Sequence, residues 1–475
     1  MTNNTEQNKD EAGEGLIDKK KSWIKFSIVA SIYLLFAFWH GNFWMLLGLP
    51  FIFDIYVSKK IPWGAWKKSK NPHVKKIAEW VDAIVFALIA VYIINLYIFQ
   101  NYQIPTASLE KSLLVGDFLF VSKMSYGPRV PNTPLSFPLA QHTLPFFDCK
   151  SYFDWPQWDY KRVAGFGTVK RKDIVVFNFP TGDTVTVKVN NPDYYYLCLE
   201  RGRDAVWADK QSFGEVVYRP VDRRENYVKR CIGMPGDSLQ IIDNAVYIDG
   251  QMMQNPEQLQ FNYFVETSGM SFSDAQFRKL DVSVDDRVAV HNADLLDYLG
   301  FEPQEGGNFN PVYNIPLTKE AYKMLVSSGW MKKIVIEPDV FGGPMYPLTY
   351  NTGWTRDNYG PLWIPKKGES ISLNALNIGL YSRCIVNYEG NTMRIEGDNI
   401  FINEQAASSY TFKYDYYFMM GDNRHKSADS RSWGFVPEDH VVGKPILVWL
   451  SLDKDRGWFD GGIRWNRIFK MVDKI

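Results

Sequence analysis

Three stretches of the chain combine reactive side chains with turn residues at close spacing. The first surrounds Ser108, the second surrounds Lys229, and the third contains Ser427, Asp429 and Arg431. These residue types can supply a nucleophile, a base and ion pairs. Taken singly, each stretch also fits an ordinary loop, and an exposed Asp–Arg pair would contribute little to stability. The three stretches are therefore candidate parts of a site whose chemistry depends on how they are combined.

The segment before Ser108 indicates where the site works. Residues 83–99 form an almost continuous apolar run, which predicts a membrane-spanning helix within residues 80–100. Ser108 follows this run closely in the chain. A serine held so near a span can only act at the membrane surface.

Two more apolar runs precede this span, at residues 23–39 and 43–57, after a polar segment at 1–22 that we expect to be a disordered cytoplasmic tail. Each run is near the lower limit of about 17 residues for a span. Lysines flank the pair on both sides: Lys19, Lys20, Lys21 and Lys25 before it, and Lys59, Lys60, Lys67, Lys68, Lys70, Lys75 and Lys76 after it. Because lysine favours the cytoplasmic side, we expect a helical hairpin with both ends inside and a third span that carries the rest outward. The alternative is one signal anchor followed by an interfacial segment.

Composition narrows the class of protein. The formal net charge is zero, so no overall charge favours nucleic acid as a partner. The four cysteines, Cys149, Cys198, Cys231 and Cys384, are widely separated. This spacing predicts neither a zinc site nor a disulfide framework, and we expect no metal and no cofactor.

Beyond Gln100 the chain consists mainly of short β-rich runs separated by long connections. We expect an anchor at 23–100 and a β core formed by 101–250 and 396–455. Residues 251–395 are expected to be an inserted subdomain away from the chemistry, and 456–475 a basic, aromatic tail. The tail is expected either to lie at the lipid headgroups or to pack against the core.

Together and in this order, the three stretches resemble the motifs of bacterial type I signal peptidases, the membrane-anchored Ser/Lys proteases that remove signal peptides. A fourth match, Lys172-Asp-Ile-Val-Val-Phe, lies between the first and second stretches. The matching pieces cover about residues 100–127, 171–180, 225–250 and 410–450. The sequence differs from the family after the serine, where Leu109-Glu110-Lys111-Ser112-Leu113 replaces the usual Met-x-Pro-Thr-Leu. It also has Arg171-Lys172-Asp173 in place of Arg-Gly-Asp.

The resemblance implies a mainly β fold, with an antiparallel β catalytic core, large insertions and N-terminal transmembrane helices. It places the nucleophile at Ser108 and the general base at Lys229. Ser427 would support the lysine by a hydrogen bond, and the Thr106 hydroxyl would help to hold the oxyanion. Arg230, Asp422, Asp429 and Arg431 would be structural ionic partners. Lysine in place of the histidine of eukaryotic and archaeal relatives implies a bacterial plasma membrane.

The implied substrates are the signal peptides of exported preproteins, bound as an extended strand beside the site. The implied surroundings are the lipid bilayer and the secretion machinery, with the catalytic domain on the outer face of a multi-pass protein. Eight residues are expected to wall the substrate pocket, or else to belong to the core: Tyr102, Ile104, Pro105, Leu109, Leu113, Val176, Tyr227 and Val228.

A lysine base has a physical requirement. Its reference pKa is about 10.4, and burial lowers this value by disfavouring the ammonium. A pKa near 8 requires a difference of about 3 kcal/mol between the two protonation states. Apolar neighbours of Lys229 such as Val228 and Ile232 are expected to supply this environment.

Two rival interpretations compete with this one. Ser108 and Lys111 have the S-x-x-K spacing of penicillin-binding proteins, which form an acyl enzyme with a serine that opens a helix. That class also needs a Lys-Thr-Gly element, which the sequence lacks, and Pro105 disfavours a helix opening at Ser108. The second rival is a non-catalytic, membrane-anchored β scaffold, which activity measurements on a Ser108 variant would distinguish from an enzyme.

Overall fold

The structure is a computed structural model that describes residues 3–63, 71–147, 149–189, 191–457 and 460–475, with side chains from Lys19 onward. Lys67, Lys68 and Lys70 lie outside the described residues. The first element is one long helix, α1, at Asn3–His40. The polar segment expected to be a disordered tail is therefore helical from Asn3, as a continuation of the apolar helix that follows it.

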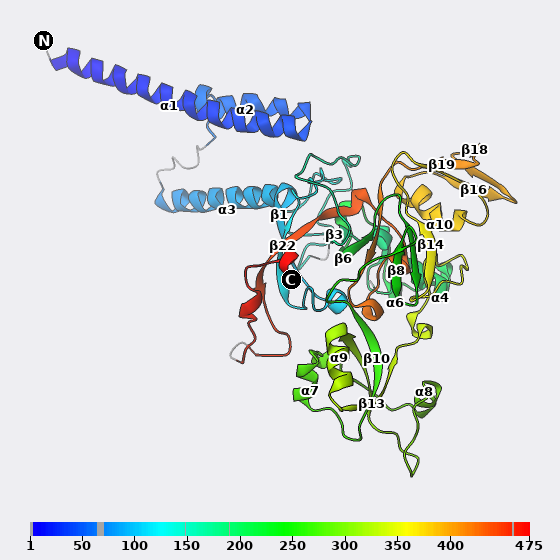
Figure 1. Ribbon diagram of the computed structural model, residues 1–475. Coiled ribbons are helices and arrows are strands. Elements are labelled where there is room, and N and C mark those ends of the chain that lie inside the picture. Colours follow the sequence, from blue (N-terminus) through cyan, green and yellow to red (C-terminus); the bar gives the residue numbers. More distant parts are fainter. Residues whose placement is uncertain (1–2, 64–70, 148, 190, 458–459) are drawn as a thin grey trace.

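The second apolar run folds back on α1 (Figure 1). It consists of a 3-10 turn at Phe43–Gly48, helix α2 at Leu49–Phe53 and a π turn at Asp54–Ser58. The Phe53 ring lies edge-on to the rings of Trp23 and Phe26. The expected hairpin is therefore formed, but its second arm is short.

The third apolar run is helix α3, Pro72–Tyr97, which begins earlier than the expected span at 80–100. Among the described residues, two helical segments are long and apolar enough to cross a membrane, Lys19–His40 and Pro72–Tyr97. The segment Phe43–Ser58 falls below that length, so the structure gives two candidate spans rather than three. Asp54 accounts for the early end of this arm, because its carboxylate accepts hydrogen bonds from the Lys60 and Ile61 backbone and the Trp63 indole.

The β core confirms the expected fold class. Its main sheet has the strand order β1-β2-β22-β3-β6-β20-β21, with β23 also paired to β22, and all of these pairs are antiparallel. The strands are β1 Phe99–Gln103, β2 Asp117–Ser122, β3 Ile174–Asn178, β6 Asn226–Gly233, β20 Tyr416–Met420, β21 Val436–Pro437, β22 Val441–Ser451 and β23 Lys470–Met471. Every residue of β3 and β20 is buried, as expected for runs that are apolar apart from Asn178 at the end of β3, whereas β2 alternates buried and half-buried residues.

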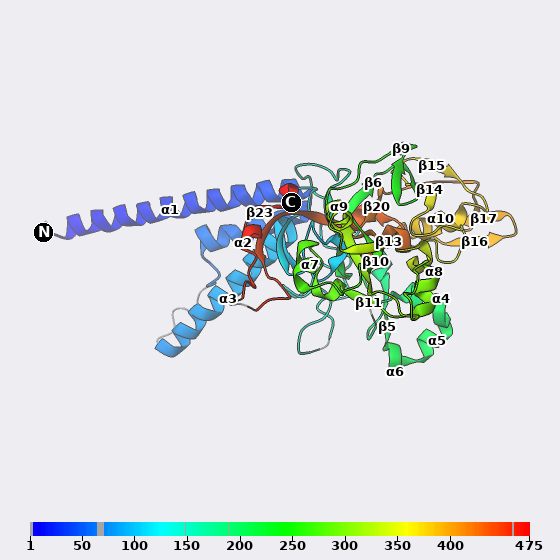
Figure 2. The same ribbon diagram turned by 60° about the horizontal axis from the view of Figure 1, so that its bottom comes forward.

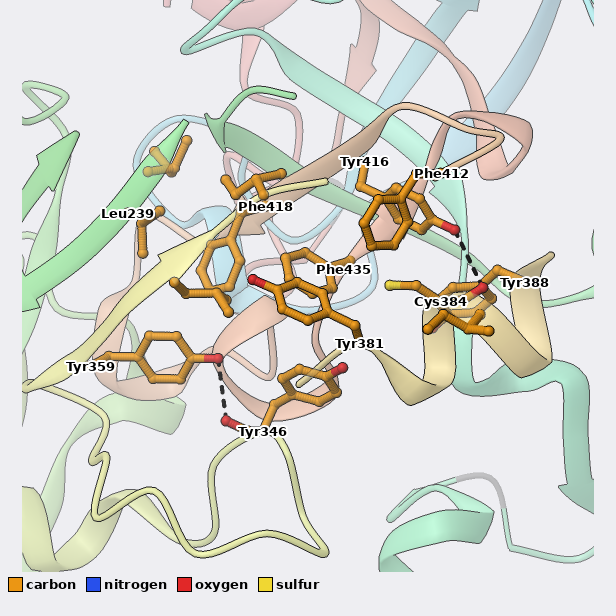
Figure 3. Close-up of a cluster of buried hydrophobic side chains, with 14 of the residues drawn as sticks. Leu239, Tyr346, Tyr359, Tyr381, Cys384, Tyr388, Phe412, Tyr416, Phe418 and Phe435 are labelled. Atoms are coloured by element: carbon orange, nitrogen blue, oxygen red, sulfur yellow. Dashed lines mark hydrogen bonds between the residues drawn. The ribbon is translucent and has the colours of Figure 1, made fainter. Parts of the chain in front are cut away.

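A second, four-stranded sheet has the order β14-β7-β8-β9, formed by Tyr359–Trp363, Ser238–Ile242, Ala245–Ile248 and Gln251–Met252. It packs with helix α10, Ile378–Arg383, around an aromatic core shown in Figure 3. Tyr359 and Tyr381 are buried in that core, where the Tyr359 hydroxyl donates to the Tyr346 carbonyl at 3.3 Å. These residues come from the segment expected to be inserted, so its second half belongs to the β core.

The first half of the insertion forms a separate unit below the β core in Figure 1. Its sheet has the order β11-β12-β10-β13, formed by Val288–Val290, Val312–Thr318, Gln260–Thr267 and Met331–Ile336. Helices α7 Asp274–Lys279, α8 Ala293–Tyr298 and α9 Lys319–Ser327 accompany it. The Gln260 backbone N–H donates to the Asp422 carbonyl at 3.0 Å, in the third candidate stretch. This contact corrects the expectation that the insertion lies away from the chemistry.

The remaining elements are smaller, and among them β16 and α4 lie toward the outside of the β core (Figures 1 and 2). They are β4 Thr184–Thr186, β5 Val216–Tyr218, β15 Ser370–Ser372, β16 Met393–Glu396, β17 Asn399–Ile402, β18 Gln405–Ala406, β19 Ser409–Thr411, α4 Tyr194–Arg201, α5 Arg203–Ala208, α6 Lys210–Phe213 and α11 Ser430–Trp433.

The C-terminal tail packs against the core. Strand β23 pairs with β22, and buried Arg467 donates to the buried Asp117 carboxylate at 2.6 Å. Trp465 and Phe469 remain exposed on this segment.

Candidate active site

Ser108 lies in a short 3-10 helix, Ala107–Leu109, on the connection between β1 and β2. Its side chain is buried, and its carbonyl accepts a hydrogen bond from the Asn423 backbone N–H at 3.1 Å. The Asn423 side chain also donates to the Ala107 carbonyl at 3.3 Å. The third stretch therefore fixes the backbone that carries Ser108.

Lys229 is brought to Ser108 by the main sheet. It lies on β6, opposite Val175 of β3, and is buried. Its Nζ lies 2.6 Å from the Ser108 Oγ and donates a hydrogen bond to it. When the lysine is neutral, the same geometry lets the serine hydroxyl donate to Nζ. The candidate nucleophile and the candidate base are therefore in direct contact.

The surroundings of Lys229 favour its neutral form. Burial lowers the pKa of its ammonium to about 8, against the opposing effects of Asp429 and Asp422, and Arg431 lowers it further. The ring of Tyr227 lies 5.8 Å from Nζ. This environment meets the requirement for a lysine that acts as a base near neutral pH.

Ser427 lies close to the dyad but does not bond as the resemblance implied. Its Oγ is buried and has no hydrogen-bond partner among the described residues, so the expected bond to Lys229 is not formed.

Gly421 makes the close packing between Ser427 and the Ser108 backbone possible. A Cβ at this position would lie 2.3 Å from the Ser427 Oγ and 2.6 Å from the Ser108 carbonyl oxygen.

The expected ionic partners form two pairs. Arg431 donates to both carboxylate oxygens of Asp429, at 2.9 and 2.8 Å, and both residues are buried. Burial opposes ionisation of Asp429, but Arg431 and the Gly421 backbone N–H hold the pKa of its carboxyl below the usual value. Arg431 also donates to the Arg424 carbonyl at 2.6 Å, so this pair ties both ends of the third stretch together.

The second pair joins Arg230 and Asp422, with hydrogen bonds of 2.8 and 2.6 Å. Ser112 donates to the same carboxylate at 2.6 Å and lies 3.1 Å from the Arg230 guanidinium. Arg230 also donates to the Lys172 carbonyl at 2.9 Å. All four motifs of the resemblance therefore meet in one network of contacts.

Lys111 takes no part in the dyad. Its Nζ lies 3.0 Å from the Asp281 carboxylate of the inserted unit and also donates to the Asp281 carbonyl. The backbone φ of Lys111 is 75°, so no helix continues from Ser108 to this lysine. The geometry required by the S-x-x-K interpretation is absent from this described segment.

The expected pocket residues divide by burial. Ile104, Leu109, Leu113 and Val176 are buried together in one apolar cluster, and Tyr102 and Val228 pack against it while half-buried. Tyr227 is half-buried and stacks on Phe179, with ring centroids 4.3 Å apart. Pro105 and Thr106 are exposed.

Sequence reasoning missed Asn423, Ser112 and Gly421, which hold the backbone and the ion pairs of the site. Only Gly421 carried a sequence signal, since a glycine beside a reactive stretch indicates a close approach of other atoms. Among the described residues, no group of three or more His, Cys, Asp or Glu is arranged to hold a metal ion.

A serine hydroxyl against a buried lysine, on an antiparallel β fold behind two apolar helices, is the arrangement of a membrane-anchored serine endopeptidase. The sequence matches the family described as signal peptidase, peptidase S26, over residues 77–288 and 388–450. The chain belongs to this family.

Similar proteins agree with this assignment. A signal peptidase I of Buchnera aphidicola (subspecies Acyrthosiphon pisum) is 24% identical over 438 residues, which cover 90% of this chain and 94% of that protein. A signal peptidase I of Haemophilus influenzae is 22% identical over 424 residues, covering 86% and 79%. A third, from Rickettsia massiliae, is 24% identical over 423 residues, covering 85% and 95%. The protein is therefore a serine endopeptidase with a signal peptidase function.

Proposed function

We propose that this protein removes signal peptides from exported preproteins with Ser108 as nucleophile and Lys229 as general base. The observation that carries the proposal is the 2.6 Å contact between a buried lysine and a serine hydroxyl. Because burial lowers the lysine pKa to about 8, a substantial fraction of Lys229 is neutral near physiological pH.

The reaction follows from these positions. Ser108 Oγ attacks the scissile carbonyl while Lys229 Nζ takes the hydroxyl proton. The oxyanion is held by the Ser108 backbone N–H and the Thr106 hydroxyl, which makes no capping hydrogen bond to its own helix. Collapse breaks the C–N bond, and the Lys229 ammonium returns the proton to the leaving amine. Water, deprotonated by the now neutral Lys229, then hydrolyses the ester and regenerates Ser108.

The substrate is proposed to bind as an extended strand beside the residues that precede Ser108 and Lys229. Exposed Pro105 and half-buried Tyr102 and Val228 are accessible to it, whereas Leu109 and Leu113 act from below the surface as part of the core. A shallow apolar wall favours small side chains next to the cut.

Purified full-length protein and a model preprotein test this proposal. Ser108→Ala and Lys229→Ala should each reduce cleavage by several orders of magnitude, because each removes one member of a unit that acts together. Cleavage by Ser108→Ala at the wild-type rate would show that this serine is not the nucleophile.

We further propose that the β core lies on the outer face of a bacterial plasma membrane, in contact with the secretion machinery that delivers preproteins. Lysines on both flanks of the hairpin formed by α1 and Phe43–Ser58 support a cytoplasmic location for its two ends, which requires the shorter arm to cross the membrane beside α1 although it falls below the length of the other two segments. Exposed Cys149 is then reachable by an impermeant thiol reagent on intact cells. Lys60→Cys, with Cys149 and Cys198 changed to serine, should stay unlabelled, and labelling of that variant would reverse the orientation.

A further inference from the structure

A cavity of about 250 Å³ lies where helix α3 meets the β core. Helix α3 contributes Tyr92 and Asn95 from its last turns, and the end of strand β2 leads into Lys123. Arg129 and Arg223 also line the cavity, whereas Ser108 and Lys229 do not. This space is therefore separate from the dyad.

Lys123 is an unusual residue in this cavity. Among the described residues, its ammonium has no hydrogen-bond or ion-pair partner, although the side chain is half-buried in the cavity wall. Burial and the charges of Arg129 and Arg223 lower its pKa to about 7, and Asp222 only partly opposes them. A partly desolvated cation without a partner, beside two further cations, costs free energy that an anionic ligand would recover.

The other charged groups of the cavity already have partners within the protein. Arg129 donates to the Asn178 side chain and the Asp439 carbonyl. Arg223 Nε donates to Thr133 Oγ1 at 2.6 Å and lies 3.8 Å from the Asp222 carboxylate. These residues fix a positive wall, and Lys123 is the group on it that can turn toward a ligand.

One acceptor in the cavity also lacks a partner. Asp222 Oδ2 accepts from the Thr133 backbone and hydroxyl at 3.0 and 2.9 Å. Asp222 Oδ1 is buried and has no hydrogen-bond partner among the described residues. A ligand that carries both an anionic phosphate and a hydroxyl group would satisfy Lys123 and Asp222 Oδ1 together.

The surroundings of the cavity indicate where such a ligand would come from. The loop between β2 and β3 bears exposed large apolar side chains, at Leu135, Phe137, Leu139, Phe146, Phe147, Phe153, Trp155 and Phe166. The same loop is joined to the ends of both apolar helices. Tyr92 of α3 contacts the Ser136 hydroxyl at 3.1 Å, and Trp39 of α1 donates to the Ala164 carbonyl at 3.0 Å. Exposed aromatic residues beside the end of a span belong at the level of lipid headgroups.

We propose that the Lys123 cavity binds the phosphate headgroup of an anionic phospholipid from the leaflet next to the β core. The proposal requires only that α3 spans the membrane, and it holds whether or not Ser108 and Lys229 are the catalytic pair. A bound headgroup would fix the β core against the end of α3 and so set the height of the site above the bilayer.

The test uses full-length protein in neutral detergent and follows its thermal midpoint as phosphatidylglycerol is added, with phosphatidylcholine, a zwitterionic lipid of zero net charge, as the comparison. Phosphatidylglycerol should raise the midpoint, because it binds the folded state. Lys123→Met should remove most of this increase, and Lys123→Arg, which keeps the charge, should retain it. Lys170→Met removes an exposed lysine of the same domain and should leave the increase unchanged.

Three outcomes would overturn the proposal. An undiminished increase in Lys123→Met would place the lipid elsewhere. An equal increase with inorganic phosphate at the same concentration would show a free-phosphate site and not a lipid site. A loss of kcat/KM in Lys123→Met that is confined to substrates with an acidic residue upstream of the cut, with no change in the lipid effect, would assign the cavity to the peptide.

Discussion

Lys111 and Asp281 form an ion pair of 3.0 Å that joins the loop after Ser108 to the inserted unit. The lysine that follows Ser108 in the chain is therefore used for attachment, whereas the lysine on the distant strand β6 contacts the Ser108 hydroxyl. The two lysines near Ser108 therefore have different partners, Asp281 for Lys111 and the Ser108 hydroxyl for Lys229.

The first prediction follows from this difference. Lys111→Ala should retain most of the cleavage activity, because it removes a contact to the exposed Asp281 of the inserted unit and leaves the dyad intact. Lys229→Ala should be inactive in the same preprotein assay. An inactive Lys111→Ala together with an active Lys229→Ala would support the S-x-x-K interpretation.

The second prediction concerns the glycine beside the dyad. Gly421→Ala should lower kcat strongly while the protein remains folded, because its methyl group would lie 2.3 Å from the Ser427 Oγ and 2.6 Å from the Ser108 carbonyl oxygen. Gly167→Ala is the matched control, since its methyl group would meet only the Ser125 carbonyl oxygen, at 3.6 Å. Equal activity of the two variants would show that the Ser108 backbone tolerates displacement.

The third prediction concerns stability. Asp429→Ala should lower the free energy of unfolding by about 3–5 kcal/mol, because it leaves the buried Arg431 charge without its partner. Asp154→Ala, which removes an exposed partner of Lys150, should cost about 1 kcal/mol or less. Chemical denaturation in detergent would compare the two, and similar losses would mean that the Asp429–Arg431 pair is not structural.

Much of the fold could be predicted from the sequence, because local patterns determine it. The apolar runs gave the helices of the anchor, and the short β-rich runs expected beyond Gln100 include those that became β2 and β3. The length of the second arm could not be predicted, since it depends on the hydrogen bonds that Asp54 accepts at the helix end.

The candidate site was predictable only through the resemblance, because Ser108 and Lys229 are 121 residues apart and meet through strand pairing. Contacts made by the insertion had no sequence signal. The bond from Gln260 to Asp422 and the pair of Lys111 with Asp281 depend on how two separate units are oriented. Lys123 was missed for the same reason, since the cavity around it is assembled from five segments of the chain, at 92–102, 123–141, 178, 222–226 and 442.

The pH dependence of activity tests the proposed mechanism most directly. Only neutral Lys229 can accept the Ser108 proton, so kcat/KM should rise with pH through the lowered pKa of about 8 and level off above it. A histidine base would instead give an acid limb near about 6.5. Lys229→Arg should be inactive over the whole range, because guanidinium stays protonated.

The decisive measurement is therefore the pH profile of kcat/KM for a soluble peptide substrate, recorded for the wild type and Lys229→Arg in detergent. For the Ser108–Lys229 dyad, we expect the kcat/KM of the wild type to have an acid limb near pH 8. We expect Lys229→Arg to be inactive at every pH, so its profile should have no such limb. Full activity of Lys229→Arg, with the same acid limb as the wild type, would contradict the assignment of Lys229 as the base.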